Sequence, residues 1–173
     1  TVLEEKADCG IGFDGDGDRL VIVDGKGVVY DGDAILYLIA THRREKQIVA
    51  TIMSNFGFEH PLKSEGIDLI RAKVGDRYVL EQVKQYNLTL GGESSGHIIC
   101  MDKHTTGDGI IAALQALQAI LDKNMTIAES LQHIPKSTQT MINVQLKDRT
   151  GWETEAVTAE IERVEKALGD NGR

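Results

Sequence analysis

The chain has 173 residues, 41% of them hydrophobic, and a formal net charge of −8 at pH 7. This length and apolar fraction suffice for one ordinary domain or two small ones. The negative charge disfavours nucleic acid, whose phosphates would be repelled, and no apolar run reaches the roughly 20 residues that span a bilayer. We therefore expect a cytoplasmic protein without nucleic-acid or membrane partners.

The first third of the chain predicts strands around an acidic loop, followed by a helix. Residues 8–13 and 20–23 have the composition of two short strands, and residues 14–19 form the loop between them. A helix should begin near Asp33, which can cap it, because the apolar residues after it recur at helical spacing. A further strand is predicted over residues 47–53.

The middle of the chain alternates helices with strands. Residues 57–65 suit a short helix with Pro61 in its first turn, and residues 69–73 suit a strand. Asp76 can cap the next helix. The predicted buried face of that helix is Val79, Val83 and Tyr86. This alternation implies βαβ units and a largely parallel sheet.

Two more strands and a long helix complete the predicted domain. The strands lie near residues 88–90 and 98–101 and flank a glycine-rich loop, and the helix covers residues 108–122. The expected buried face of this helix is Ile111, Leu114, Leu117 and Leu121. The fold class is therefore α/β, with a mixed, largely parallel sheet and flanking helices.

The end of the chain is expected to start a separate domain. After a stretch rich in Ser, Thr and Gln, the alternation of Ile142, Val144 and Leu146 predicts a half-buried strand. An amphipathic helix follows, which Gly169 can end. Its apolar residues are Val157, Ile161, Val164 and Leu168. One strand and one helix cannot bury a core alone, so we place a domain boundary near residue 137.

The loop at residues 14–19 carries the most specific chemical signal in the sequence. Asp14, Asp16 and Asp18 alternate with glycines that permit sharp turns, and three like charges so close repel one another. A divalent cation relieves this repulsion, and carboxylate oxygens suit Mg²⁺. Arg19 suits a phosphate, because its planar guanidinium stays charged and donates in a fork. The alternative is a solvated acidic turn.

A calcium loop of the EF-hand type is the competing metal site. That loop needs glycine at its sixth position and a bidentate glutamate at its twelfth. Arg19 and Gly25 occupy those positions here. The sequence therefore favours Mg²⁺ over Ca²⁺.

A second loop, residues 91–97, displays short polar side chains between glycines. Glu93 can accept hydrogen bonds from neighbouring sugar hydroxyls and Ser95 can donate or accept, so the loop suits a vicinal diol. His97 is a candidate acid or base. The alternative is a hairpin with an ordinary glycine turn and a structural histidine, and the loop alone does not separate the two.

A third signal follows the predicted strand at residues 69–73, at its carboxyl end, where ligands bind in open α/β sheets. Lys73 and Arg77 can hold a phosphate, and Asp76 lies between them. The alternative, which these residues alone favour, is a capped helix start with solvated charges. Residues 105–109 likewise suit a helix cap or an anion contact.

These loops, in this order, resemble those of the α-D-phosphohexomutase superfamily, and in particular its bacterial branch that acts on glucosamine phosphates. The likeness extends over essentially the entire chain. It implies that the three aspartates of the acidic loop bind Mg²⁺, that Arg19 contacts a phosphate and that His97 transfers a proton. The substrate-binding residues that it implies are Lys73, Asp76, Arg77, Glu93 and Ser95.

The reaction implied by this resemblance interconverts glucosamine 6-phosphate and glucosamine 1-phosphate through a phosphoserine enzyme and a sugar 1,6-bisphosphate. Asp76 stands where glucose- and mannose-specific relatives carry a histidine, which favours this substrate. The alternatives are a phosphomannomutase or phosphoglucomutase of the same superfamily and a non-catalytic metal- and sugar-binding module. A metal-dependent phosphatase is a further alternative, against which the sugar loop argues.

The resemblance also implies a place within a four-domain enzyme. Residues 1–31 would be the last strands of the second domain with the metal loop, and residues 32–136 the complete third domain with the sugar loop. Residues 137–173 would be the incomplete start of the fourth domain. The phosphoserine domain and most of the last domain would then be missing partners of this chain. We therefore expect residues 1–173 alone to be inactive.

Overall fold

The computed structural model of the chain describes residues 1–132, 134–146, 154–169 and 172. The chain divides into two compact units, Thr1–Lys136 and Ser137–Arg173. Among the described residues, no helix is both long enough and apolar enough to cross a membrane. The assignment of the chain to three family domains stays a prediction.

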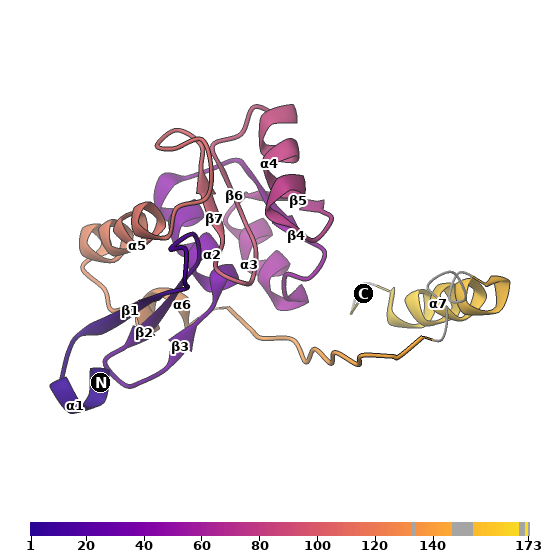
Figure 1. The fold of residues 1–173 in the computed structure, drawn as a ribbon, viewed down its shortest axis with the longest axis horizontal. Coiled ribbons are helices and arrows are strands. Elements are labelled where there is room, and N and C mark those ends of the chain that lie inside the picture. The colour runs from indigo at the N-terminus through magenta and orange to yellow at the C-terminus, as the bar shows by residue number, and fades with distance from the viewer. Residues whose placement is uncertain (133, 147–153, 170–171, 173) are drawn as a thin grey trace. The chain divides into compact units, whose positions relative to one another are not determined.

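The first unit opens with a short helix and a small antiparallel sheet (Figure 1). These elements are α1 (Val2–Glu5), β1 (Cys9–Phe13), β2 (Leu20–Asp24) and β3 (Val29–Tyr30). The strand order is β1-β2-β3, and both pairs are antiparallel. Because Phe13 pairs with Leu20, residues 14–19 close the β1–β2 hairpin as its loop. The two predicted strands around the acidic loop are therefore confirmed.

A second, mixed sheet forms the centre of the first unit. Its strands are β4 (Gln47–Thr51), β5 (Asp68–Ala72), β6 (Leu90–Gly92) and β7 (Ile98–Cys100). In the order β5-β4-β6-β7, β4 runs parallel to β5 and to β6, and only the β6–β7 pair is antiparallel. The predicted α/β class with a mixed, largely parallel sheet is thus confirmed. The carboxyl ends of β4, β5 and β6 consequently lie at one edge of this sheet.

Helices cover both faces of the central sheet, because successive side chains of β4 point to opposite faces and both faces are apolar. Ile48 and Ala50 enter the larger core, whereas Val49 enters a smaller one with Val79 and Val83. The first core is covered by α2 (Gly32–Arg43) and α5 (Gly109–Lys123), and the second by α4 (Asp76–Gln85). In Figure 1, α5 and α4 lie on opposite sides of the central strands. The shorter helices are η1 (Phe56–Phe58), α3 (Glu59–Ser64) and α6 (Ile127–Leu131).

The caps of α2 and α4 differ from the prediction. Asp31 caps α2, because its side chain accepts a hydrogen bond from the Ala34 amide at 3.2 Å. Asp33 is buried instead and accepts a hydrogen bond from the Asn55 amide at 2.8 Å. The N-cap of α4 is Gly75, with φ 124°, so Asp76 is the first residue of the helix rather than its cap.

The buried face of α5 also differs from the prediction. Leu114 and Leu121 are 59% and 72% exposed. The buried residues of this face are Ala112, Ala113, Ala116 and Ala119. Small side chains let α5 lie close to α2 and to the sheet, which turns the larger leucines outward. In α4 the predicted Val79 and Val83 are buried, but Tyr86 is 49% exposed because it follows the last helical residue.

The second unit contains one well-formed helix among its described residues. This helix, α7 (Glu155–Leu168), begins after Thr154, whose hydroxyl accepts a hydrogen bond from the Val157 amide, and ends at Gly169 as predicted. The predicted strand with Ile142, Val144 and Leu146 is wrong: residues 141–146 have no regular structure and these side chains are exposed. A strand needs a hydrogen-bonded neighbour. None is found among the residues that the structure describes.

Candidate functional site

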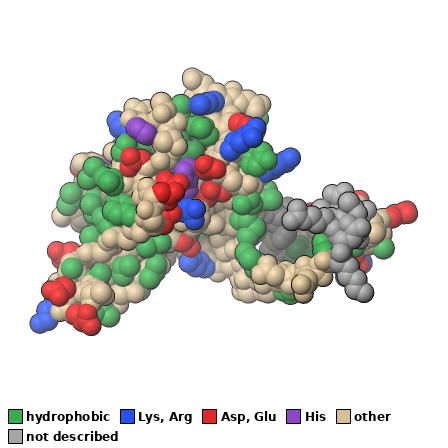
Figure 2. Space-filling view, viewed as in Figure 1, with side chains coloured by type: hydrophobic (Ala, Val, Ile, Leu, Met, Phe, Trp, Pro, Cys, Tyr) green, Lys and Arg blue, Asp and Glu red, His purple; other side chains and the backbone are tan. Residues whose placement is uncertain are grey.

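A cleft of about 470 Å³ lies where the carboxyl ends of the parallel strands meet the β1–β2 loop. Ligands bind at this edge in open α/β sheets. Figure 2 shows acidic side chains gathered with a histidine on this face. The lining residues come from four loops and are Asp18, Arg19, Thr51, Met53, Val74, Gly75, Asp76, Glu93, Ser94, Ser95 and His97.

The acidic loop brings its three carboxylates together. Asp14, Asp16 and Asp18 each offer an oxygen, and these oxygens all lie within 4.8 Å of one another. The loop is closed by the Arg19 amide, which donates to Asp14 Oδ1 at 3.1 Å. The buried Asp18 Oδ1 forms no hydrogen bond with any described residue. This set of hard, partly unpaired oxygens fits a divalent cation such as Mg²⁺.

Arg19 sets the electrostatics of this loop. Its Nε lies 3.2 Å from Asp14 Oδ2 and 3.7 Å from Asp18 Oδ1. Desolvation by itself raises the pKa of Asp14, but the hydrogen bond from the Arg19 amide and the guanidinium charge outweigh it, so the pKa lies below its ordinary value. Asp14 is therefore ionised at neutral pH, which suits a cation ligand.

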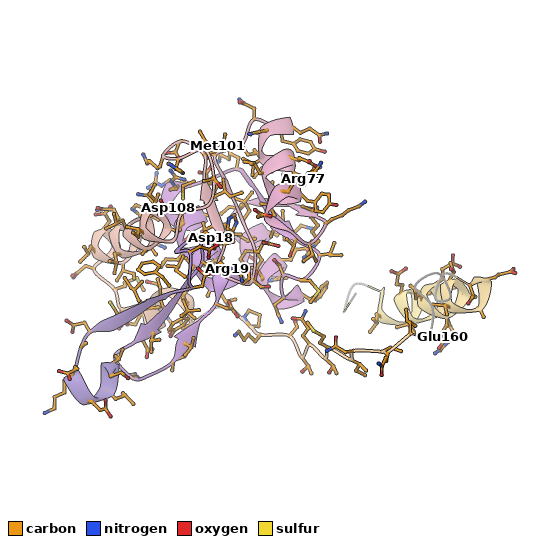
Figure 3. All side chains as sticks on the ribbon, in the orientation of Figure 1. Asp18, Arg19, Arg77, Met101, Asp108 and Glu160 are labelled. Atoms are coloured by element: carbon orange, nitrogen blue, oxygen red, sulfur yellow. The ribbon has the colours of Figure 1, made fainter. Side chains whose placement is uncertain are left out.

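The start of α5 fixes the position of the acidic loop. The Gly109 amide, at the start of α5, donates to the Gly17 carbonyl at 3.0 Å, and Asp108 caps α5 by accepting from the Ile111 amide at 2.9 Å. Figure 3 shows Asp18 and Arg19 together at the tip of the β1–β2 hairpin. The interpretation of residues 105–109 as a helix cap is thus confirmed at Asp108.

The sugar loop predicted at residues 91–97 is packed tightly against the rest of the unit. Glu93 Oε1 accepts a hydrogen bond from the Gly75 amide at 2.9 Å, which leaves its other oxygen for a ligand. Gly96 has φ 96°, and a Cβ there would lie 2.1 Å from the Leu20 carbonyl oxygen. A Cβ at Gly32 would lie 1.9 Å from the Glu93 carbonyl oxygen. The observed packing of the loop therefore needs glycine at position 96 in the loop and at position 32 in α2.

His97 lies between the acidic loop and the cleft. It is 3% exposed, and its Nε2 lies 3.6 Å from Asp18 Oδ2. Its ring packs on Gly107, where a Cβ would approach Nε2 to 2.2 Å. The buried Nδ1 has no hydrogen-bond partner among the described residues. An imidazole with one uncommitted nitrogen at a cleft wall can hold or move a proton.

The structure brings most of the predicted site residues together but not all of them. Those lining the cleft are Asp18, Arg19, Asp76, Glu93, Ser95 and His97. Lys73 lies over the ring of Tyr78 instead, with its Nζ 6.0 Å from the ring centroid. Arg77 Nε pairs with Glu81 at 2.9 Å, and Figure 3 shows Arg77 out on α4, away from Asp18 and Arg19. The substrate contacts of Lys73 and Arg77 stay predictions.

Sequence reasoning missed the part of the cleft wall at the carboxyl end of β4, which is formed by Thr51 and Met53. This segment is held from two sides. Arg71 Nη1 donates to the Thr51 carbonyl at 3.1 Å, and Asp33 accepts from the Asn55 amide as described above. Burial raises the pKa of Asp33, and the Asn55 amide opposes that effect. No local signal marks this arrangement, because Asp33 and Asn55 are far apart in the sequence.

The sequence and the fold both have close parallels among known proteins. Residues 31–137 match the family described as phosphoglucomutase/phosphomannomutase, alpha/beta/alpha domain III. The phosphoglucosamine mutase of Azoarcus sp. is 49% identical over 178 residues, which cover 100% of this chain and 40% of that protein. The chain therefore spans about two fifths of the length of the curated relatives that it matches.

Solved structures share the fold. A phosphoglucomutase/phosphomannomutase family protein from Burkholderia thailandensis has a TM-score of 0.69 at 26% identity, over 81% of this chain and 31% of that one. The N-acetylphosphoglucosamine mutase of Aspergillus fumigatus, solved with GlcNAc-6P and magnesium, has a TM-score of 0.73 at 17% identity. That match covers 91% of this chain and 43% of the fungal one.

Proposed function

Since the chain belongs to the phosphoglucomutase/phosphomannomutase family, we propose that it forms the Mg²⁺- and sugar-binding part of a phosphoglucosamine mutase. This enzyme would interconvert glucosamine 6-phosphate and glucosamine 1-phosphate through a phosphoserine and a sugar 1,6-bisphosphate. The substrate follows the relative that is 49% identical over the whole chain. The observation that carries the proposal is the meeting of the acidic loop and the sugar loop in one cleft.

Each loop has a separate task in this proposal. Glu93 keeps one carboxylate oxygen on the Gly75 amide and presents the other to a sugar hydroxyl, while Ser95 donates or accepts beside it. Arg19 holds a phosphoryl oxygen with its guanidinium. His97 takes up the proton of the reacting sugar hydroxyl on its imidazole ring and returns it in the reverse step. Its buried ring can do so because Nδ1 has no hydrogen-bond partner among the described residues.

The cation site of this proposal is the cluster of Asp14, Asp16 and Asp18. Bound Mg²⁺ would neutralise charge on the phosphoryl group, which matters because phosphoryl transfer depends mainly on positioning and electrostatics. The magnesium in the fungal structure that shares this fold supports the choice of metal. The His97 contact to Asp18 would connect the cation site to the proton-transfer group.

A coupled assay of the full-length polypeptide tests the proposal. With Mg²⁺ and a sugar 1,6-bisphosphate primer, we expect glucosamine 6-phosphate to be converted into glucosamine 1-phosphate. Residues 1–173 alone should give no turnover under the same conditions, because the phosphoserine that the family reaction requires is not predicted among them. Sustained turnover by residues 1–173, with contaminating enzyme excluded, would contradict this mechanism.

A phosphoglucomutase or phosphomannomutase is the second candidate. It is favoured by the likeness to the Burkholderia thailandensis protein, which is described at the level of that broader family. Kinetics with glucose, mannose and glucosamine phosphates separate the two candidates. A kcat/KM for glucose or mannose phosphate above that for glucosamine phosphate would replace the first candidate with the second.

A further inference from the structure

The cleft holds more acidic than basic side chains. Asp18, Asp76 and Glu93 line it, with Arg19 as the one Lys or Arg among the lining residues that the structure describes. Asp18 belongs to the cation site, so a bound metal offsets its charge. Among the described residues, no cationic side chain other than Arg19 then lines the cleft to balance Asp76 and Glu93. A sugar phosphate would meet this acidic wall on entering.

In the proposed function, Glu93 and Ser95 contact the sugar hydroxyls. The role of the second carboxylate of this wall, Asp76, is not explained by those contacts. Asp76 is exposed, and its side chain forms no hydrogen bond or ion pair within the described part of the chain. It directly follows Gly75, whose amide holds Glu93 at 2.9 Å. Asp76 and Glu93 therefore line adjacent parts of the same cleft.

An unpartnered carboxylate repels the phosphate of a substrate, and a positive charge on the same substrate offsets that repulsion. A hexose phosphate has no positive group, whereas a hexosamine phosphate carries an ammonium beside its phosphate. The ammonium donates up to three charge-assisted hydrogen bonds, and a carboxylate without a partner accepts them well. The cleft is also built for a ligand in a second respect, because the deeply buried His97 lines it and the Nδ1 of this ring has no hydrogen-bond partner among the described residues.

We propose that Asp76 binds the ammonium group of an amino sugar phosphate and so selects it over a hexose phosphate that has no ammonium group. This inference rests on the proposed function, because it names the selectivity residue of that same cleft. The alternative role of Asp76 is structural. As an acidic residue in the first turn of α4, it stabilises the positive end of the helix dipole.

Asp76→Asn in the full-length polypeptide separates the two roles, because it keeps the shape of the side chain and removes its charge. The readout is the ratio of kcat/KM for glucosamine 6-phosphate to that for glucose 6-phosphate. We expect this ratio to fall about tenfold or more, the scale of a charge-assisted hydrogen bond. N-acetylglucosamine 6-phosphate, which has the same substitution without the charge, should show no comparable loss.

Glu81→Gln is the matched control, since Glu81 lies on the same helix and pairs with Arg77 outside the cleft. Its selectivity ratio should equal that of the parent enzyme. An equal effect of Asp76→Asn on all three sugars, or none on any, would overturn the inference. A change in thermal stability alone would assign Asp76 to the helix dipole and overturn it as well.

Failure of the proposed function gives a different result, namely a parent enzyme that turns over no glucosamine phosphate. Binding then decides the inference, with the Gly75 amide resonance as the reporter because this amide contacts Glu93. Titration with glucosamine 6-phosphate and glucose 6-phosphate should show tighter binding of the amino sugar, and Asp76→Asn should remove the difference. Equal affinities in the parent protein would overturn the inference.

Discussion

The acidic loop and the sugar loop both contain several glycines, but for different physical reasons. A Cβ at Gly15 or Gly17 would meet no atom within 4 Å. A Cβ at Gly91 would lie 2.7 Å from Val83, and one at Gly92 2.6 Å from Ile98, both core side chains. The acidic loop thus uses glycine to bend an exposed chain around like charges, whereas the sugar loop uses it to fit into the core.

This difference predicts different consequences of mutation. Substitutions in the acidic loop should act through charge and leave the fold intact. Substitutions of the glycines in the sugar loop should disturb the packing of the core and so lower the free energy of unfolding. The comparison can be tested one glycine and one carboxylate at a time.

The largest effect is expected from Gly96→Ala. The new Cβ would lie 2.1 Å from the Leu20 carbonyl oxygen, and the φ of 96° is strained for alanine. Together these should lower the free energy of unfolding by about 3 kcal/mol. Urea denaturation followed by circular dichroism measures the change. A loss below about 1 kcal/mol would mean that the sugar loop is not packed as described.

Glu93→Gln should have the next largest effect, on catalysis. In the full-length polypeptide we expect a loss of about 1.5 to 3 kcal/mol of transition-state stabilisation, the scale of a hydrogen bond to a charged group. Steady-state kinetics with the hexosamine phosphate measure it, and Glu81→Gln again serves as the control outside the cleft. Unchanged kinetics would refute the sugar-holding role of Glu93.

Asp16→Asn should weaken Mg²⁺ binding by at least about tenfold, because it removes one of the three charged ligands and keeps the shape of the loop. Asp16 is exposed, so the free energy of unfolding should stay the same. Calorimetric titration of both proteins with Mg²⁺ and Ca²⁺ is the measurement. Equal Mg²⁺ affinity, or a clear preference of the parent for Ca²⁺, would argue against a catalytic cation site.

The smallest effect is expected from Gly15→Ala. Its Cβ would enter open space, and its backbone lies outside the left-handed region. The free energy of unfolding should therefore change by no more than about 0.5 kcal/mol. Measured beside Gly96→Ala under the same conditions, this variant completes the comparison. A loss as large as that of Gly96→Ala would contradict the distinction between the two loops.

Sequence reasoning succeeded where the determinants are local. The hairpin around the acidic loop follows from the Asp-Gly alternation between apolar runs, and the end of α7 follows from Gly169. Asp33 was predicted as the cap of α2, whereas the cap is Asp31; both are acidic residues near the start of this helix. Which of the two caps the helix depends on the Asn55 amide, which donates a hydrogen bond to Asp33. Asn55 is 22 positions further along the chain, so a local pattern does not reveal this contact.

Two further errors, in α5 and around Val144, have the same long-range origin. The apolar pattern of α5 predicted that its leucines are buried. Because α2 packs close to α5, the small Ala112 and Ala116 are buried instead. The strand predicted around Val144 depended on a neighbour that the described residues do not supply. Lys73 and Arg77 were expected at the cleft from their position after β5. In this structure Lys73 lies over Tyr78 and Arg77 pairs with Glu81, and their substrate contacts stay predictions.

The acidic loop and the sugar loop are joined directly through their backbones. Arg19 forms a β-bridge with His97, and the Leu20 amide donates to the Gly96 carbonyl at 3.2 Å. We therefore expect that a ligand that orders one loop would change the free energy of ordering the other, so that the proposed cation and sugar would bind cooperatively. Thermodynamic reciprocity would make this coupling symmetric: the factor by which the cation raises sugar affinity would equal the factor by which the sugar raises cation affinity.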